Sequence, residues 1–119
     1  LMMASFFGGM SIAYSQVGAC HALSYGLSYV LGTHHGIGCC IVFDYLDEFY
    51  SEGIKEFRTM MEKCNIELPR DLVKNLKEEQ IETMITVALG LEPLWENCLG
   101  KEWKNIMTRD KARTLFLKM

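Results

Sequence analysis

Charge placement is the feature of this sequence that most restricts its fold. Its first 43 residues contain no Asp, Glu, Lys or Arg, and all 12 basic and all 15 acidic side chains lie between Asp44 and Lys118. Because exposing so much uncharged, largely apolar chain to water is unfavourable, we expect residues 1–43 to be buried. A membrane, or the interior of a larger protein, would bury them.

The membrane interpretation fits residues 1–43 poorly. A spanning helix needs about 20 consecutive apolar residues, and small or polar side chains interrupt every window of that length. Basic flanks and a signal-peptide leader are also missing. We therefore expect no membrane partner. Since the sequence opens on an apolar helix without a cap, we expect a fragment whose missing part covers this face.

Net charge and cysteine content exclude two further classes of protein. The formal charge of -3 provides no clustered basic surface, so we expect no nucleic-acid partner. Five cysteines are an odd number without a regular spacing, which argues against a disulfide-stapled secreted domain. We expect reduced thiols and a cytoplasmic protein.

Apolar residues recur at helical spacing along most of the chain, and no alternating strand pattern occurs. Gly32 suits the left-handed position after a helix end, and Gly18 and Ala22 belong to a small-residue face that another backbone can approach. The sequence predicts an all-α bundle of six to eight helices. We expect helices over residues 1–14, 17–31, 37–49 and 78–89, an amphipathic helix after Gly53, a short helix from Pro69, helical spacing from Trp95 to Trp103, and a last helix capped by Thr108.

All three histidines lie in the uncharged region. A lone histidine on an apolar helix, such as His21, is more often a hydrogen-bonded core residue than a ligand. His34 and His35 occupy a Gly-flanked break, where a histidine can cap, pack or coordinate. If the flanking helices are antiparallel, two imidazoles from the helix and the break can converge on one zinc or iron ion.

The neighbouring thiols compete for a ligand role. Cys39 could share a helix face with His35, whereas Cys40 points to nearly the opposite face from His34. The Cys39-Cys40 pair lacks the C-x-x-C spacing with which two thiolates grip zinc, so we interpret both as small buried hydrophobes. Cys20 faces about 100° away from His21 and is not expected to be a co-ligand.

The region around the histidines resembles a known family. Residues 9–22 read Gly-Met-Ser-Ile-Ala-Tyr-Ser-Gln-Val-Gly-Ala-Cys-His-Ala, and His35-Gly36 follows after a turn. This pattern is similar to the signature of iron-containing (group III) alcohol dehydrogenases, in which two histidines 14 positions apart are two of four metal ligands. His21 and His35 have that spacing. The other two family ligands, an aspartate and a histidine, precede the corresponding region.

The resemblance implies a fold and an activity. Residues 1–119 would be the helical metal-binding domain of the dehydroquinate synthase-like fold, preceded by a nucleotide-binding α/β domain. The activity would be a metal-dependent alcohol dehydrogenase using Fe2+ or Zn2+, with NAD or NADP bound mainly by the preceding domain. We also expect a homo-oligomer.

Departures from the family pattern point to a substrate class. Tyr25 replaces a second family histidine, His34 replaces a proline, and Asp44 and Tyr45 stand where the family has Pro and His. These residues are similar to a sugar-acid branch, the 3-deoxy-manno-octulosonate 8-oxidases, which implies oxidation of a terminal alcohol of a sugar acid. Tyr25 and His34 would then be the catalytic candidates beside the substrate.

Two alternatives stay open at this point. A zinc-dependent relative of dehydroquinate synthase or glycerol dehydrogenase would retain the same two histidines. A non-enzymatic helical interaction module would instead use the uncharged first third as a partner-binding face.

Overall fold

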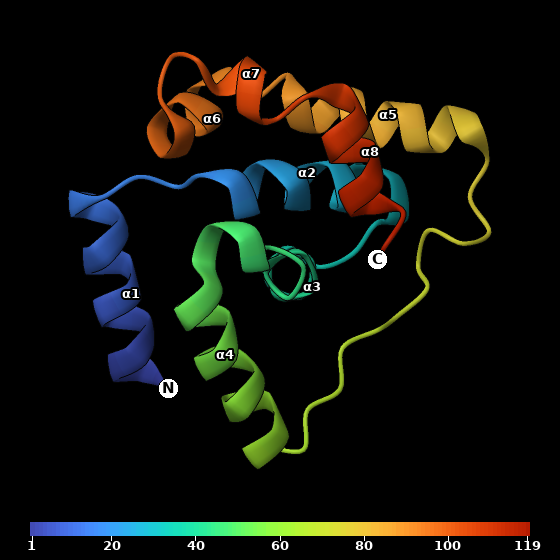
Figure 1. Ribbon diagram of the computed structural model, residues 1–119. Helices are drawn as coiled ribbons and strands as arrows, with labels where there is room; N and C mark the ends of the chain where they lie inside the picture. Colours follow the sequence, from blue (N-terminus) through green and yellow to red (C-terminus); the bar gives the residue numbers. More distant parts are fainter.

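Eight α-helices and no strand make up the computed structural model, which describes residues 1–119 (Figure 1). The all-α class predicted from the sequence is confirmed, and the number of helices falls within the predicted range. The assignment to a particular bundle fold stays a prediction. The helices are α1 (Met2–Tyr14), α2 (Ala19–Leu31), α3 (His35–Phe43), α4 (Asp47–Lys63), α5 (Glu78–Leu89), α6 (Glu92–Leu99), α7 (Trp103–Ile106) and α8 (Arg109–Phe116).

Helix α2 is the centre of the fold and packs against α3, α5 and α6. Its buried side chains include Leu23 and Leu27. Gly26 lets α5 approach closely, because a β-carbon there would lie 2.5 Å from the carbonyl oxygen of Met84. At Gly18 a β-carbon would lie 2.8 Å from that of Cys98. The predicted small-residue face of this helix is therefore a packing surface.

Local sequence signals set several helix ends. Helix α5 has the predicted bounds, with Glu78 and Glu79 in its first turn, where the helix dipole favours negative charge. The Thr108 hydroxyl accepts a hydrogen bond from the backbone N–H of Lys111 and caps α8 as predicted. Gly32 ends α2 with φ 67° in the left-handed region, which confirms the expectation for that glycine.

Three helix predictions need correction. The helix expected over residues 37–49 is two helices, because α3 ends at Phe43 and α4 begins at Asp47. No helix forms from Pro69, since the segment between α4 and α5 consists of turns and irregular chain. The helical spacing from Trp95 to Trp103 is interrupted at Gly100, whose φ of 78° separates α6 from α7.

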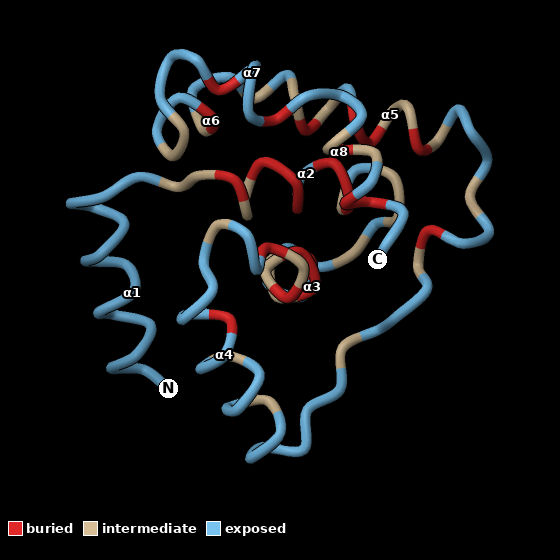
Figure 2. Tube along the Cα trace, in the orientation of Figure 1, coloured by how far each residue is buried: buried red, intermediate tan, exposed pale blue.

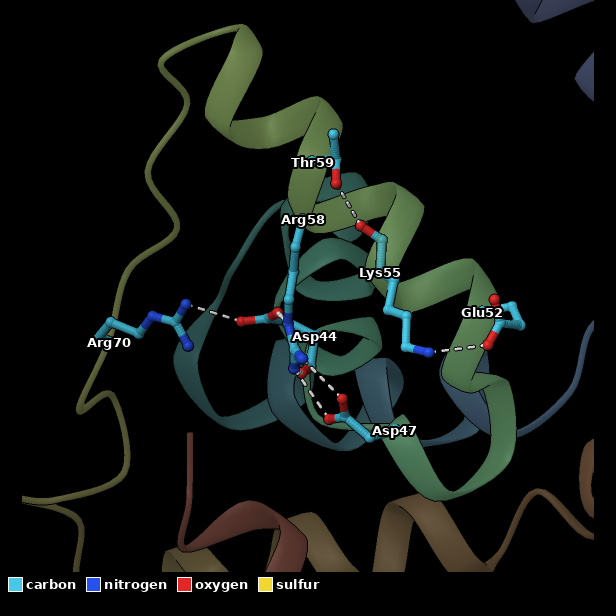
Figure 3. A network of polar contacts seen from close by, with 7 residues as sticks. All are labelled: Asp44, Asp47, Glu52, Lys55, Arg58, Thr59 and Arg70. Atoms are coloured by element: carbon cyan, nitrogen blue, oxygen red, sulfur yellow. Dashed lines mark hydrogen bonds and ion pairs between the residues drawn. The ribbon is translucent and has the colours of Figure 1, made fainter.

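The turn between α3 and α4 is held by ion pairs of Asp44 (Figure 3). The side chain of Asp44 is only 5% exposed, and its oxygens lie 2.7 Å from Arg58 Nε and 2.8 Å from Arg70 Nη2. Arg58 also binds the carboxylate of Asp47, which lowers the pKa of Asp47. These pairs join α3, α4 and the segment that leads to α5.

Helix α1 lies apart from the other helices (Figure 1). Each residue from 1 to 16 is exposed, including Phe6, Phe7 and Ile12 (Figure 2). Within residues 1–119, contacts between helices bury much of α2 and α3 but leave α1 exposed. The expectation that another part of a larger protein covers α1 stays a prediction. None of the eight helices combines the length and the apolar character that a membrane crossing requires.

Candidate metal centre between α2 and α3

Three potential metal ligands converge where α3 crosses α2. His21 comes from the first turn of α2, while His35 and Cys39 lie one turn apart on α3. One ligand atom from each residue lies within 4.8 Å of the other two. The ring centroids of His21 and His35 are 5.1 Å apart. Of the three residues, His35 is exposed, and the other two are partly buried.

The crossing of two helices creates this site. In Figure 1 α3 is seen end-on beneath α2, so the two helices cross steeply. The antiparallel arrangement that the sequence suggested for convergence of the two imidazoles is therefore not the one observed. Gly38 allows the close approach, because a β-carbon there would lie 3.0 Å from the hydroxyl oxygen of Ser28. His35 is the first residue of α3 and not part of an irregular break, so its side chain is oriented by the helix.

Hydrogen bonds hold Cys39 in place. Its Sγ lies 3.6 Å from His35 Nε2 and 3.9 Å from Nδ1. In its thiol form it also donates to the hydroxyl of Ser24 at 3.3 Å, and this hydroxyl in turn donates to the carbonyl oxygen of His21 at 2.9 Å. The thiol therefore belongs to a short polar chain that connects both helices.

The surroundings of Cys39 favour its thiolate form. Hydrogen bonding with the thiol of Cys20, together with Ser24 and the two imidazoles, lowers the pKa of Cys39 to about 5 against the opposing effect of burial. The same interaction with Cys39, and burial, raise the pKa of Cys20. Cys20 is thus a thiol that donates hydrogen bonds, including one of 3.3 Å to the Cys39 carbonyl oxygen. A thiolate is the form that binds a metal ion.

Tyr25 lies beside the ligand group. Its ring stacks on that of His35, with centroids 5.3 Å apart and planes inclined by 25°. Tyr25 is 45% exposed and also lines a shallow pocket of about 370 Å³, in which four of the five lining residues are hydrophobic. The structure thus places Tyr25 next to a predicted ligand.

His34, the other catalytic candidate, lies outside the ligand group. It is exposed at the N-cap position of α3, and its side chain makes no capping hydrogen bond. Of the four site residues named from the sequence, the structure brings His21, His35 and Tyr25 together and leaves His34 at the margin.

A larger pocket of about 570 Å³ lies elsewhere, and its lining includes Asp44, Arg58 and Arg70. Its arginines and Asp44 are paired with one another (Figure 3): Arg58 binds two carboxylates, and Arg70 binds Asp44 and the hydroxyl of Tyr45. The pocket also contains Glu62 and Glu67, which form no ion pair. Groups that already satisfy each other offer little to a ligand. We therefore assign the pocket a structural role and the chemistry to the group between α2 and α3.

Sequence reasoning missed Cys39 as a member of the site. The available signal was the spacing His35-x-x-x-Cys39, which places both side chains on one face of a helix, as in the two-histidine motif H-E-x-x-H of zinc enzymes. The adjacent pair Cys39-Cys40 lacks the C-x-x-C spacing with which two thiolates grip zinc, and this favoured the interpretation of both as small buried hydrophobes.

No protein-family model matches the chain. The resemblance to iron-containing alcohol dehydrogenases therefore rests on the motif residues around His21 and His35.

Proposed function

We propose that this chain is the helical metal-binding part of a metal-dependent, NAD(P)-linked alcohol dehydrogenase. The observation that supports the proposal most strongly is the convergence of His21 and His35, the two residues whose spacing resembles the family signature, within one group of ligand atoms. The proposed substrate is a primary alcohol of a polyol or a sugar acid, with the terminal alcohol of 3-deoxy-manno-octulosonate as the specific candidate.

The residues fit a divalent transition-metal ion. Imidazole nitrogens and a thiolate are ligands that zinc and other borderline-soft ions prefer, and no acidic residue lies among the three. His21 and His35 would hold the ion. When bound, it would act as a Lewis acid that favours the deprotonated form of the substrate alcohol.

The other side chains of the site would orient the ligands and the substrate. The ring of Tyr25 stacks on one face of the His35 imidazole and limits its rotation. The His35 ligand is therefore oriented before the ion binds. The phenol of Tyr25 can donate a hydrogen bond to a substrate oxygen or accept one from a substrate hydroxyl. His34, on the exposed side, would contact the polar part of the substrate.

This chain provides no recognisable dinucleotide cradle. The sequence contains no Gly-x-Gly-x-x-Gly motif, and Gly8 and Gly9 lie inside α1. In the proposed enzyme the nicotinamide nucleotide would be bound by a separate α/β domain, and we assign no residue of this chain to it.

One observation favours a different class of function. The exposed apolar residues of α1 are what a helical interaction module would present to a partner. Such a module would need neither His21 nor His35, so the two functions differ in their dependence on these residues. A zinc-dependent relative such as glycerol dehydrogenase would share the histidines and differ in its substrate.

The decisive experiment expresses the complete natural reading frame and measures NAD- or NADP-dependent oxidation of polyols and sugar acids with added Fe2+ or Zn2+. We expect metal-dependent turnover that His21→Ala and His35→Ala reduce by about 100-fold or more, since each removes a metal ligand and loss of a ligand's hydrogen-bonding partner alone costs about 10–100-fold. His34→Ala is the matched control for metal content and should bind as much metal as the natural protein. Turnover that does not depend on His21 and His35, or no turnover on any alcohol, would overturn the proposal.

A further inference from the structure

We propose that Cys39 is a third ligand to the metal ion, so that this chain provides two imidazoles and one thiolate and selects Zn2+ over Fe2+. The inference rests on the proposed metal-binding role of His21 and His35. It goes beyond that role, because it adds a sulfur ligand and names the metal.

The distances match a zinc site with mixed ligands. Zinc binds histidine nitrogen at about 2.0–2.1 Å and cysteine sulfur at about 2.3 Å, which places N and S about 3.5 Å apart in a tetrahedron. The Sγ of Cys39 already lies 3.6 Å from Nε2 of His35. His21 completes the triangle within 4.8 Å. One ion can therefore reach all three atoms after small side-chain rotations.

Helix geometry makes this pair a preformed chelate. His35 and Cys39 are four residues apart in α3, and residues at this spacing lie on the same face of a helix. The helix backbone thus fixes the separation of two ligands before any metal binds. The hydrogen bond between Cys39 and Ser24 also ties the sulfur to α2, the helix that carries His21.

The chemistry of the ligands decides which metal fits best. Thiolate ligands favour zinc, whereas carboxylate ligands suit harder ions. Enzymes of the family that this sequence resembles bind their ion through one carboxylate and imidazoles, without sulfur. Imidazole and thiolate ligands are combined in zinc enzymes, whose catalytic sites leave one position open for water or substrate. The exposed edge of His35 leaves such a position accessible.

Neighbouring thiols do not share this geometry. Cys40 follows Cys39 directly and therefore projects about 100° away around the helix. Burial raises its pKa, which disfavours the thiolate. Cys20 is engaged as a donor to the carbonyl oxygen of Cys39. Cys40 is thus a matched control for Cys39, because it is the same residue type on the same helix.

Cobalt(II) titration of the protein expressed from its complete natural reading frame tests the proposal, since Co2+ reports its ligands by absorption. We expect a thiolate-to-cobalt charge-transfer band in the near ultraviolet and intense visible bands of tetrahedral cobalt. Cys39→Ser should abolish the charge-transfer band, and Cys40→Ser should preserve it. Competition with a chelator measures Zn2+ affinity, which should be lower in Cys39→Ser by roughly 10–100-fold or more. Loss of a ligand's hydrogen-bonding partner alone costs that much, and Cys39→Ser removes the ligand itself. Zn2+ should also bind the natural chain more tightly than Fe2+.

Alkylation of the natural chain gives a second measurement that needs no variant. Iodoacetamide labelling followed by mass spectrometry should show that Zn2+ protects Cys39, while the exposed Cys64 is labelled equally with and without metal. A charge-transfer band that survives Cys39→Ser, or equal labelling of Cys39 with and without Zn2+, would overturn this inference. If His35→Ala abolished Co2+ binding in that case, the proposed role of the histidines would still stand. The two proposals therefore fail separately.

Discussion

The ring of Tyr25 stacks on the imidazole of His35, with the centroids 5.3 Å apart. This contact depends on the aromatic ring and not on the phenolic hydroxyl. Tyr25→Phe should therefore keep the ligand oriented, and Zn2+ affinity should change by less than about twofold, within the range of a weak contact. In the enzyme from the complete reading frame the same variant should lower kcat/KM by about 10-fold or more, because a hydroxyl that contacts the substrate is lost.

Tyr29→Phe is the matched control for this prediction, since Tyr29 lies one turn further along α2 and is 71% exposed. Isothermal titration with Zn2+ and steady-state kinetics are the measurements. Equal kcat/KM values for the two variants would contradict a substrate role for Tyr25.

Close packing of α2 on α5 predicts an intolerant position at Gly26. A β-carbon there would meet the backbone carbonyl of Met84 at 2.5 Å, and a backbone atom cannot rotate away as a side chain can. Gly26→Ala should lower the free energy of unfolding by about 1–3 kcal/mol, as overpacking does. Urea denaturation followed by circular dichroism measures the change. Gly8→Ala, with nothing within 4 Å of the new carbon, should cause no loss.

Asp44 should contribute more to stability than a surface carboxylate. Its side chain is 5% exposed and forms ion pairs with two arginines that are 45% and 58% exposed (Figure 3). Because solvent screens both partners, we expect Asp44→Ala to cost about 1–3 kcal/mol, less than a fully buried pair. Glu52→Ala is the control and should cost less than about 0.5 kcal/mol, since its pair with Lys55 is exposed. Equal losses of unfolding free energy in Asp44→Ala and Glu52→Ala would show that Asp44 does not hold the turn.

Acid should weaken the junction between α3 and α4. Two hydrogen bonds from Arg58 lower the pKa of Asp47 below its ordinary value of 3.8. A carboxyl group of this kind contributes stability that is fully present above its unfolded pKa and is lost as the pH falls through the lower folded pKa. The urea midpoint should therefore drop between about pH 4.5 and pH 2.5. Asp47→Asn should reduce the size of the drop, and Glu96→Gln, at an exposed position without an ion pair, should not.

Features set by neighbouring residues could be predicted from the sequence. The bounds of α5, the Thr108 cap and the left-handed Gly32 depend on capping and glycine chemistry within a few positions. The same holds for the all-α class, because helical periodicity is a local signal. The selection of His21 and His35 came from a motif, which records spacing but not the path of the chain between the two residues.

Only the tertiary structure decided which side chains share the site and which helix lies exposed. The steep crossing of α2 and α3 brings Cys39 to the two histidines, and the ion pairs of Asp44 with Arg58 and Arg70 divide the predicted third helix. Both depend on contacts between residues at least 14 positions apart in the sequence. No capping or periodicity rule reaches that far, since helix patterns describe one face of one helix, and only packing of the whole chain determines which faces meet.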